Sequence, residues 1–237
     1  MITEIKQQIL EKYTFRTELH AHTFPISRCS DFYAEELIEL YKKVGVHSIV
    51  LTNHFTPDHL KNGNKSEVVK RYTDAFSEFK RIAAENGIAA IFGMELRFTE
   101  NFNDYLLYGI EEADVADIYD LVDSGLESFY KSFKKDGVLV VQAHPKRDRM
   151  TEIDTRYVDG QEGFNMHLGH NSRVALATAC ANKKGLIVTG GSDFHHLGHE
   201  GSCLLRSKTK ITTSKELSAL LESRDYVLDV GGSIILP

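Results

Sequence analysis

The protein has 237 residues, with 28 Lys and Arg against 34 Asp and Glu and a formal charge of −6. This acidic balance excludes a general nucleic-acid binder, which needs a basic surface for its phosphate contacts. The content of 42% hydrophobic and 26% charged residues excludes intrinsic disorder. No apolar run approaches the roughly 18 residues of a membrane span. The polar, helix-like start has no signal-peptide core, and three cysteines without a CxxC spacing predict a cytoplasmic protein without disulfides.

Short apolar runs alternate along the chain with longer segments of helical periodicity. We expect strands where hydrophobic residues are nearly continuous, as in SIVLT and VLVVQA, because parallel strands are buried on both faces. We expect helices where apolar residues recur every three to four positions and a glycine follows, as at Gly45, Gly87 and Gly137. In the first half of the chain, the predicted elements are strand 16–23, helix 34–44, strand 47–52, a helix whose apolar stripe covers 68–82, strand 88–94 and strand 105–110. They are followed by helix 115–133, strand 138–143, strand 161–165, a helix that begins at Asn171 and strand 186–190. The last two are a helix that follows the capping box of Thr213 and Glu216, and strand 226–230.

The order of these elements predicts a single α/β domain over residues 1–237. No internal repeat, low-complexity stretch or linker divides the sequence. Seven or eight strand–helix repeats in this length favour a parallel barrel over an open sheet. An open dinucleotide-binding sheet is the alternative, but no GxGxxG turn follows its first strand.

Imidazole and carboxylate side chains stand at the ends of five predicted strands. Barrel enzymes build their active sites at the C-terminal ends of the strands, so we expect these side chains to share one site. His20 and His22 end the first strand, and their spacing of two residues puts both on one face of the chain. The others directly follow later strands and are His54, Glu95, His144, Asp193 and His195.

This set of side chains predicts a cluster of metal ions. Five histidines and two carboxylates exceed the ligands of one four-coordinate zinc ion. Two or three divalent ions, with Glu95 as a bridge, would use them all, and imidazole with carboxylate suits Zn, Mn or Fe. Such ions lower the pKa of a bound water to about 7 and clamp the oxygens of an in-line displacement. We therefore expect hydrolysis of a phosphate ester by a metal-activated hydroxide.

The motifs at these positions resemble those of the PHP (polymerase and histidinol phosphatase) superfamily. They are HAH at 20–22, SD at 30–31, TNH at 52–54, GME at 93–95, AHP at 143–145 and GSDFH at 191–195. The resemblance runs from residue 16 to residue 200 and implies a distorted (β/α)7 TIM-like barrel, a three-metal site at the C-terminal ends of its strands, and phosphoesterase activity. The metal ligands that it implies are His20, His22, His54, Glu95, His144, Asp193 and His195.

Two places depart from the family pattern. The segment after the paired histidines is longer than the usual HTxxSD, so Asp31 is either a further metal ligand, as we predict, or the N-cap of the next helix. Near the fourth strand the family has a histidine and this chain has none. Either Asp104 replaces it, or the third ion has fewer protein ligands.

Three arginines are the candidates for phosphate binding, because a guanidinium group can form bidentate hydrogen bonds. Arg97, Arg147 and Arg173 each lie close in sequence to a predicted site residue or helix start. The alternative for each is a surface charge paired with a neighbouring acid, such as Arg147 with Asp148.

The remaining polar residues near these strand ends have less specific signals. No general acid is identifiable, and His170, His196 or a metal-bound water could serve. His167 and His170 lie in a loop on the same side, and His196 and His199 are expected to be bystanders. Cys29 has no histidine at a recognisable spacing, so we expect no nucleophilic thiol.

The sequence thus predicts a metal-dependent phosphatase or phosphoesterase for a small phosphorylated substrate, such as histidinol phosphate or a nucleotide. One alternative is an amidohydrolase-type hydrolase, which usually bridges its metals with a carboxylated lysine where this chain has Glu95. Another is a catalytically silent metal-binding regulatory module. The sequence carries no signal of oligomeric state.

Overall fold

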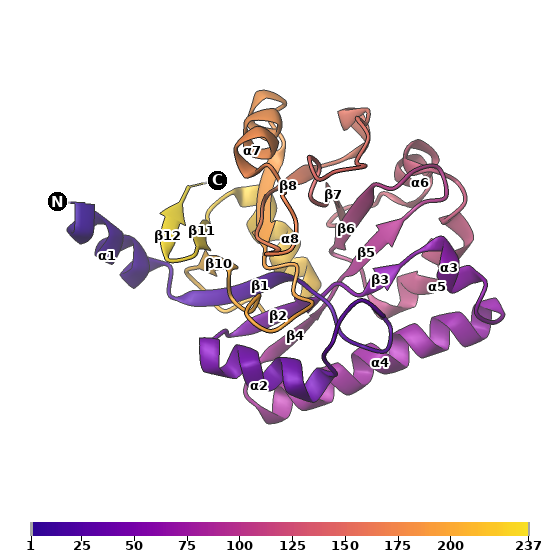
Figure 1. The fold of residues 1–237 in the computed structure, drawn as a ribbon, viewed down its shortest axis with the longest axis horizontal. Coiled ribbons are helices and arrows are strands. Elements are labelled where there is room, and N and C mark those ends of the chain that lie inside the picture. Colours follow the sequence, from indigo (N-terminus) through magenta and orange to yellow (C-terminus); the bar gives the residue numbers. More distant parts are fainter. Residues whose placement is uncertain (1, 237) are drawn as a thin grey trace.

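Twelve strands form two six-stranded sheets in the computed structural model, which describes residues 2–236 (Figure 1). The first sheet has the order β12 (Ser233–Ile235), β11 (Val227–Val230), β10 (Cys203–Ser207), β1 (Phe15–Ala21), β2 (Ser48–Leu51) and β4 (Ala89–Phe92). The second has the order β3 (His54–Phe55), β5 (Met94–Arg97), β6 (Asp104–Tyr108), β7 (Leu139–Gln142), β8 (Gly160–Asn165) and β9 (Ile187–Gly191). The predicted α/β class and all eight predicted strands are confirmed, and the sequence did not indicate β3, β5, β10 and β12.

The two sheets meet where strands of one continue into the other. The chain passes from β2 to β3 through only two residues, and from β4 to β5 through Gly93 alone. On the other side, Ala21 at the end of β1 bridges to Phe194 just after β9. Across residues 2–236 a closed barrel is not shown, because the hydrogen-bonded ladders divide into these two sheets.

The direction of β6 differs from the parallel repeat that the sequence predicted. β6 pairs antiparallel with both β5 and β7, whereas β1 with β2, β2 with β4, and β7 with β8 are parallel. A short hairpin without a helix joins β5 to β6, so the first residue of β6, Asp104, lies opposite the last residue of β5, Arg97. This reversal brings the start of β6 to the edge where the parallel strands end.

The helices are α1 (Ile2–Lys12), α2 (Ala34–Val44), α3 (Pro57–Leu60), α4 (Lys65–Glu85), α5 (Val115–Leu121), α6 (Leu126–Phe133), α7 (Val174–Lys183) and α8 (Ser214–Ser223), with 3-10 turns at Glu112–Asp114 and Thr155–Tyr157. Helix α2 has the predicted bounds, and the Thr213 side chain caps α8 by accepting from the Glu216 amide. The single helix predicted over 115–133 is instead two, because Gly125 has a φ of 77° that interrupts the helix before α6.

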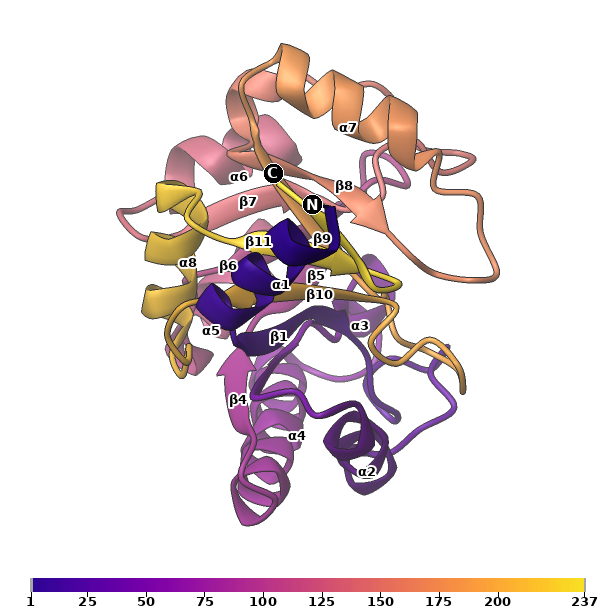
Figure 2. The same ribbon diagram turned by 90° about the vertical axis from the view of Figure 1, so that its left-hand side faces the viewer.

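Apolar helix faces cover the sheets on opposite sides. Helices α2 and α4 lie together on one side, and α7 packs on β8 at the other (Figure 2). Leu37, Ile38 and Tyr41 of α2 and Phe76 and Phe79 of α4 are buried in the main apolar cluster. This packing buries the strands on their outer faces and leaves their C-terminal ends for polar side chains.

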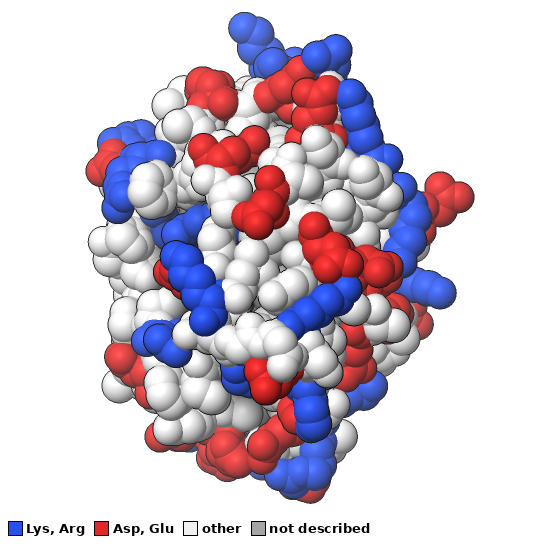
Figure 3. Space-filling view, turned by 90° about the vertical axis from the view of Figure 1, so that its right-hand side faces the viewer, with Lys and Arg blue, Asp and Glu red and all other residues white. Residues whose placement is uncertain are grey.

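The surface of the protein carries charges of both signs. On the face seen in Figure 3, Lys and Arg side chains are interspersed with Asp and Glu, and no continuous basic surface covers that face. Among the described residues, no helix combines the length and the apolar character needed to cross a membrane.

Candidate metal centre

The strand ends bring the seven predicted strand-end residues together in one buried group. His20 and His22 come from the end of β1, His54 from β3 and Glu95 from β5. His144 follows β7, and Asp193 and His195 follow β9. All are buried except His54, whose side chain is 20% exposed.

Glu95 is the centre of this group, because four imidazoles approach its two oxygens. Its Oε1 lies 3.0 Å from Nε2 of His144 and 3.4 Å from Nε2 of His20. Its Oε2 lies 2.8 Å from Nδ1 of His54 and 3.4 Å from Nε2 of His22. The structure thus brings two imidazoles to each oxygen of Glu95, and the bridging role stays a prediction.

Asp193 lies on the other side of the paired histidines. Its Oδ1 is 3.4 Å from Nε2 of His20, 3.5 Å from Nε2 of His22 and 3.3 Å from Nδ1 of His195. Its Oδ2 accepts a hydrogen bond of 2.6 Å from Arg147. His20 and His22 are therefore held between the two carboxylates.

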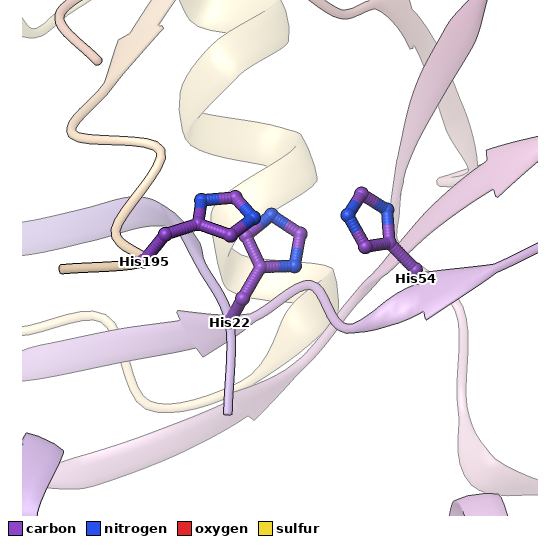
Figure 4. A group of neighbouring side chains, drawn as sticks. All are labelled: His22, His54 and His195. Atoms are coloured by element: carbon purple, nitrogen blue, oxygen red, sulfur yellow. The ribbon is translucent and has the colours of Figure 1, made fainter. Parts of the chain in front are cut away.

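The potential ligand atoms form three overlapping groups, each compact enough to hold an ion. The groups are His22 with His54 and His195 (Figure 4), His20 with His22 and Glu95, and Glu95 with Asp104 and His144. Glu95 belongs to two of these groups, and the two oxygens of its carboxylate could serve two ions. His22 also belongs to two groups, but its one free ring nitrogen, Nε2, could bind an ion in only one of them. The third group contains Asp104, which the antiparallel β6 brings next to Glu95 and His144.

Hydrogen bonds to one ring nitrogen prepare the other nitrogen to bind a metal. Nδ1 of His20 donates to the carboxylate of Glu162, and Nδ1 of His195 donates to the carbonyl of Asp193, both at 2.9 Å. Nδ1 of His22 donates to Oγ of Ser27 at 3.1 Å, because the Ser27 hydroxyl hydrogen is already given to Asn53. In the neutral rings this leaves Nε2 of all three histidines as a free lone pair, the form that ligates metal.

Unpaired polar atoms show that this donor set fits divalent ions. Within residues 2–236, five buried side-chain atoms of the group have no hydrogen-bond partner, namely Nε2 of His20, Nε2 of His22, Nδ1 of His54, Nδ1 of His144 and Oε2 of Glu95. The 2.8 Å approach between His54 and Glu95 is not aligned as a hydrogen bond. Each unpaired buried atom costs about 1–3 kcal/mol, which coordination to a metal would offset. Imidazole nitrogens and carboxylate oxygens are ligands for Zn, Mn and Fe.

The electrostatics of the buried group attract cations. Burial would raise the pKa of the Glu95 and Asp193 carboxyls, but the surrounding imidazoles hold the pKa of both well below its usual range. Burial lowers the pKa of His20, but the neighbouring carboxylates raise it well above its usual value. Burial and two neighbouring histidines instead lower the pKa of His22 well below its usual value. Both carboxylates are thus charged at neutral pH.

Glu162 is a site residue that we did not predict from the sequence. It lies in β8, where its Oε1 accepts from His20 Nδ1 at 2.9 Å. Its Oε2 accepts from the backbone N–H of His144 at 3.0 Å and from the side chain of Asn165 at 2.9 Å. The sequence feature that could have identified Glu162 is its position inside a strand expected to be buried. A buried carboxylate needs a hydrogen-bond partner, and a metal-binding histidine often provides one.

Replacing Glu162 by glutamine is expected to weaken metal binding by about 10- to 100-fold, the usual effect of losing a hydrogen-bond partner of a ligating histidine. The reason is that the glutamine amide can turn its NH2 group toward Nδ1 of His20. The ring is then no longer held with its hydrogen on Nδ1 and the lone pair of Nε2 free for a metal. Metal titration monitored by calorimetry would measure the change. Glu152→Gln is the matched control, since the Glu152 side chain is 88% exposed and pairs only with Lys146 among the described residues. Equal metal affinity in the two variants would contradict this role.

The backbone is strained at two of the candidate ligands. His144 has a φ of 29° and Asp193 a φ of 49°, values that residues other than glycine rarely adopt. Such strain is concentrated at functional sites, where surrounding contacts enforce it. The neighbouring Gly191 is also required, since a Cβ there would lie 2.5 Å from Cβ of His20. These features turn the ends of β7 and β9 toward the metal centre.

The predicted phosphate-binding arginines separate into two kinds. Arg97 and Arg147 line a cavity of about 250 Å³ next to the metal centre. Arg97 donates two hydrogen bonds to Asp104, at 2.8 and 2.7 Å, and Arg147 donates to Asp193. Arg173 is not among the described residues of this cavity. It lies 2.6 Å from Asp148, as expected for a surface charge paired with an acid.

Asp31 lies apart from the three ligand groups. Its carboxylate is 67% exposed and lies 2.7 Å from Nδ1 of His196. The N-cap alternative for Asp31 is wrong, because α2 begins at Ala34 with Tyr33 as its N-cap. The ligand role predicted for Asp31 stays a prediction.

Cys29 reaches the metal centre, although the spacing of the sequence does not connect it with any histidine. Cys29 is exposed and lines the cavity together with His54 and His195. Burial raises the pKa of this thiol, but hydrogen bonds with His195 and His54 outweigh burial and lower the pKa to about 6. The histidines of the nearby loops also border the cavity, with His167, His170 and His196 among its lining residues.

Comparisons with solved structures find the same fold at low sequence identity. A two-domain protein from Bacteroides vulgatus with a predicted PHP-like metal-dependent phosphoesterase has a TM-score of 0.69 and 17% identity over 93% of this chain and 66% of that one. The present chain thus spans slightly less than two thirds of that protein. A chain from Bifidobacterium adolescentis, put forward as a metal-dependent phosphoesterase, has a TM-score of 0.51 and 14% identity over 86% of this chain and 95% of that one. An amidohydrolase from Chromobacterium violaceum, with bound sulfate and no metal, has a TM-score of 0.50 and 17% identity over 78% of this chain and 89% of that one.

Comparison with family models gives a match to the PHP domain over residues 18–230. No curated protein matches the chain. The matched range includes β1, where the ligand set begins, and extends through β11. Since the model covers most of the sequence and all seven strand-end residues, the chain belongs to the PHP domain family.

Proposed function

We propose that the protein is a metal-dependent phosphoesterase that hydrolyses a phosphate ester of a small molecule. The observation that carries this proposal is the convergence of four imidazoles on Glu95, flanked by Asp193 and two cavity arginines. Two or three divalent ions would be held by His20, His22, His54, Glu95, Asp104, His144, Asp193 and His195. When bound, such ions act as Lewis acids and lower the pKa of water that they contact.

The residues of the chain would bind and orient the phosphate. Arg97 and Arg147 present guanidinium groups to the cavity, where they can hydrogen-bond phosphoryl oxygens and stabilise the developing negative charge. His170 and His196 also line the cavity and are the candidates for giving a proton to the leaving oxygen. Buried Glu162 and Ser27 would keep the ligating rings of His20 and His22 in orientation.

The organic part of the substrate is proposed to occupy a second cavity. This cavity has a volume of about 550 Å³ and shares Cys29 and His54 with the first, so the two adjoin. Its lining combines apolar Phe24 with the cationic Arg28 and Arg71. A volume of this size suits a small metabolite, such as histidinol phosphate or a nucleotide.

For the fold, we propose that the two sheets are parts of one distorted (β/α)7 barrel. If β2 with β3, and β4 with β5, each count as one bent strand, then these two and β1, β6, β7, β8 and β9 occupy seven positions. The bridge from Ala21 to Phe194 supports contact between the first and the last position.

Replacing Arg97 by alanine is expected to reduce kcat/KM for a phosphoester by about 100-fold, near the usual effect of losing one donor to a developing oxyanion. Arg173→Ala, the matched control, is expected to change kcat/KM by less than about threefold, because an exposed pair such as that with Asp148 contributes little. Steady-state kinetics measure both, and metal analysis checks that the Arg97 variant keeps its ions. Equal losses in the two variants would contradict phosphate binding by Arg97.

The function is tested by a phosphate-release screen of protein reconstituted separately with Zn²⁺, Mn²⁺ and Fe²⁺. The panel contains phosphomonoesters and phosphodiesters, with amides and lactones as the second arm. Release of phosphate is the expected result. Turnover of amides or lactones alone would favour the amidohydrolase alternative, although no lysine is among the described residues of the metal cavity. Stoichiometric metal without any turnover would favour a silent metal-binding module.

A further inference from the structure

The second cavity has a positively charged lining, although the chain as a whole is acidic. Arg28, from the loop between β1 and α2, and Arg71, from α4, both line this cavity of about 550 Å³. Among the described residues of the lining, the only carboxylate belongs to Asp58, and it lies 2.9 Å from the amine of Lys61. The charges of the two arginines are therefore not balanced by acids of the lining.

Both of these guanidinium groups keep free N–H donors. The side chain of Arg28 has no hydrogen bond or ion pair with any of the described residues. Arg71 donates one hydrogen bond, of 3.1 Å, to the backbone carbonyl of Asn62, which does not neutralise its charge. Arg97 and Arg147, next to the metal centre, differ in this respect because each donates to a carboxylate. Arg28 and Arg71 are thus available to a ligand without first giving up an acidic partner.

The position of the second cavity connects these cations with the metal centre. Cys29 and His54 line both cavities, so a molecule whose phosphate lies at the metal centre has room to extend past these two residues. The same lining also contains apolar Phe24 and Pro25. The part of a substrate that lies outside the metal centre would therefore meet an apolar wall together with two unpaired cations.

We propose that Arg28 and Arg71 bind a second anionic group of the substrate, a carboxylate or a second phosphate, and so select phosphate esters with two anionic ends. A guanidinium group forms bidentate, charge-assisted hydrogen bonds with either anion. An ammonium group, such as the one that histidinol phosphate carries, is repelled by the same two charges, and this repulsion adds to the selectivity. This inference rests on the proposed function and narrows its class of substrates.

The test is a set of phenyl phosphates that differ in the charge of a para substituent. The substituent ends in a carboxylate, a phosphonate, an uncharged carboxamide or an ammonium group, and each is attached through either one or three methylene groups to vary its reach. The methylene groups insulate the ring, so the ester bond is similarly reactive in all of these probes. With metal-loaded protein, kcat/KM for the better anionic probe is expected to exceed that for the carboxamide by about tenfold, a modest preference because both arginines are exposed and solvent screens their charge. The carboxylate and phosphonate arms show which anion is preferred.

Charge reversal at the two arginines separates recognition from folding. Arg28→Glu and Arg71→Glu are each expected to remove the preference for anionic probes and to raise kcat/KM for the ammonium probe relative to the carboxamide. A fold defect would instead lower kcat/KM for all probes alike. Arg81→Glu is the matched control and should keep the wild-type ratios, because Arg81 lies on the same helix as Arg71, pairs with Glu85 at 2.6 Å and is not among the described residues of the cavity. Wild-type ratios in both reversed variants would overturn the proposal.

Binding of non-hydrolysable analogues separates this inference from the proposed function. In these analogues a methylene group replaces the ester oxygen of each probe, and calorimetry measures their Kd. Tighter binding of the anionic than of the carboxamide analogue, without hydrolysis of any ester, would support the anion site and contradict the phosphoesterase. Hydrolysis with equal kcat/KM for the anionic and carboxamide probes would overturn the anion site alone. Protein that hydrolyses no ester and binds no analogue would overturn both.

Discussion

Glu95→Gln is expected to lose metal from more than one position and to reduce phosphoester hydrolysis by about 10³-fold, or about 4 kcal/mol of transition-state stabilisation. The reason is that Glu95 belongs to two ligand groups and its two oxygens face four imidazoles. Glutamine keeps the volume but has one acceptor oxygen and no charge, so it cannot bridge two ions in the same way. Elemental analysis of purified protein, together with kcat/KM, measures both effects.

The control for this variant is an exposed glutamate that undergoes the same change. Glu78 of α4 is 63% exposed and lies 3.7 Å from Arg81, so Glu78→Gln should retain its metal and activity. His54→Ala should behave like Glu95→Gln, because it removes a ligand next to the same carboxylate. A Glu95→Gln protein with full metal content and unchanged activity would show that the carboxylate does not bridge.

Removal of metal by a chelator is expected to abolish hydrolysis and to lower the thermal midpoint of unfolding. The metal-free protein keeps five buried polar atoms of the centre without hydrogen-bond partners within residues 2–236. An ion present at a thousand times its Kd stabilises the folded protein by about 4 kcal/mol. For a chain of this length, each kcal/mol shifts the midpoint by about 2–4 °C, so each ion would contribute about 8–16 °C.

Calorimetry of protein with and without chelator, and after metal is added back, measures this shift. Zn²⁺, Mn²⁺ or Fe²⁺ should restore both the midpoint and the activity, whereas Ca²⁺ should not, because it prefers a shell of oxygen ligands. Protein that unfolds at the same temperature in all of these states, and keeps its activity after chelation, would refute the metal centre.

Hydrophobic patterning determined much of the fold. All eight strands predicted from apolar runs are present, because strands buried on both faces need continuous hydrophobic residues. Four strands escaped prediction, and each is five residues or shorter. The split between α5 and α6 depends on the backbone of Gly125, which has a φ of 77°. The spacing of apolar residues does not reveal such a backbone conformation.

The residues that follow the apolar runs determined the candidate metal centre. Parallel strands must end at the same edge, so polar side chains one step beyond each run converge without further information. This argument reached His54, Glu95 and His144 from sequence position alone. It missed Glu162, because a supporting carboxylate lies inside its strand and not at the end.

Only the tertiary structure decided the details that depend on long-range pairing. The antiparallel direction of β6 brings Asp104 into the ligand groups, and strand direction is set by hydrogen bonds to partners far along the chain. The path of the loop after β1 puts Cys29 in the wall of the cavity and Asp31 beside the exposed His196. Arg97 and Arg173 look alike in sequence, and only packing shows which one faces the cavity. Composition and periodicity specify which residues are buried, but the partner of each polar group depends on contacts that no local pattern contains.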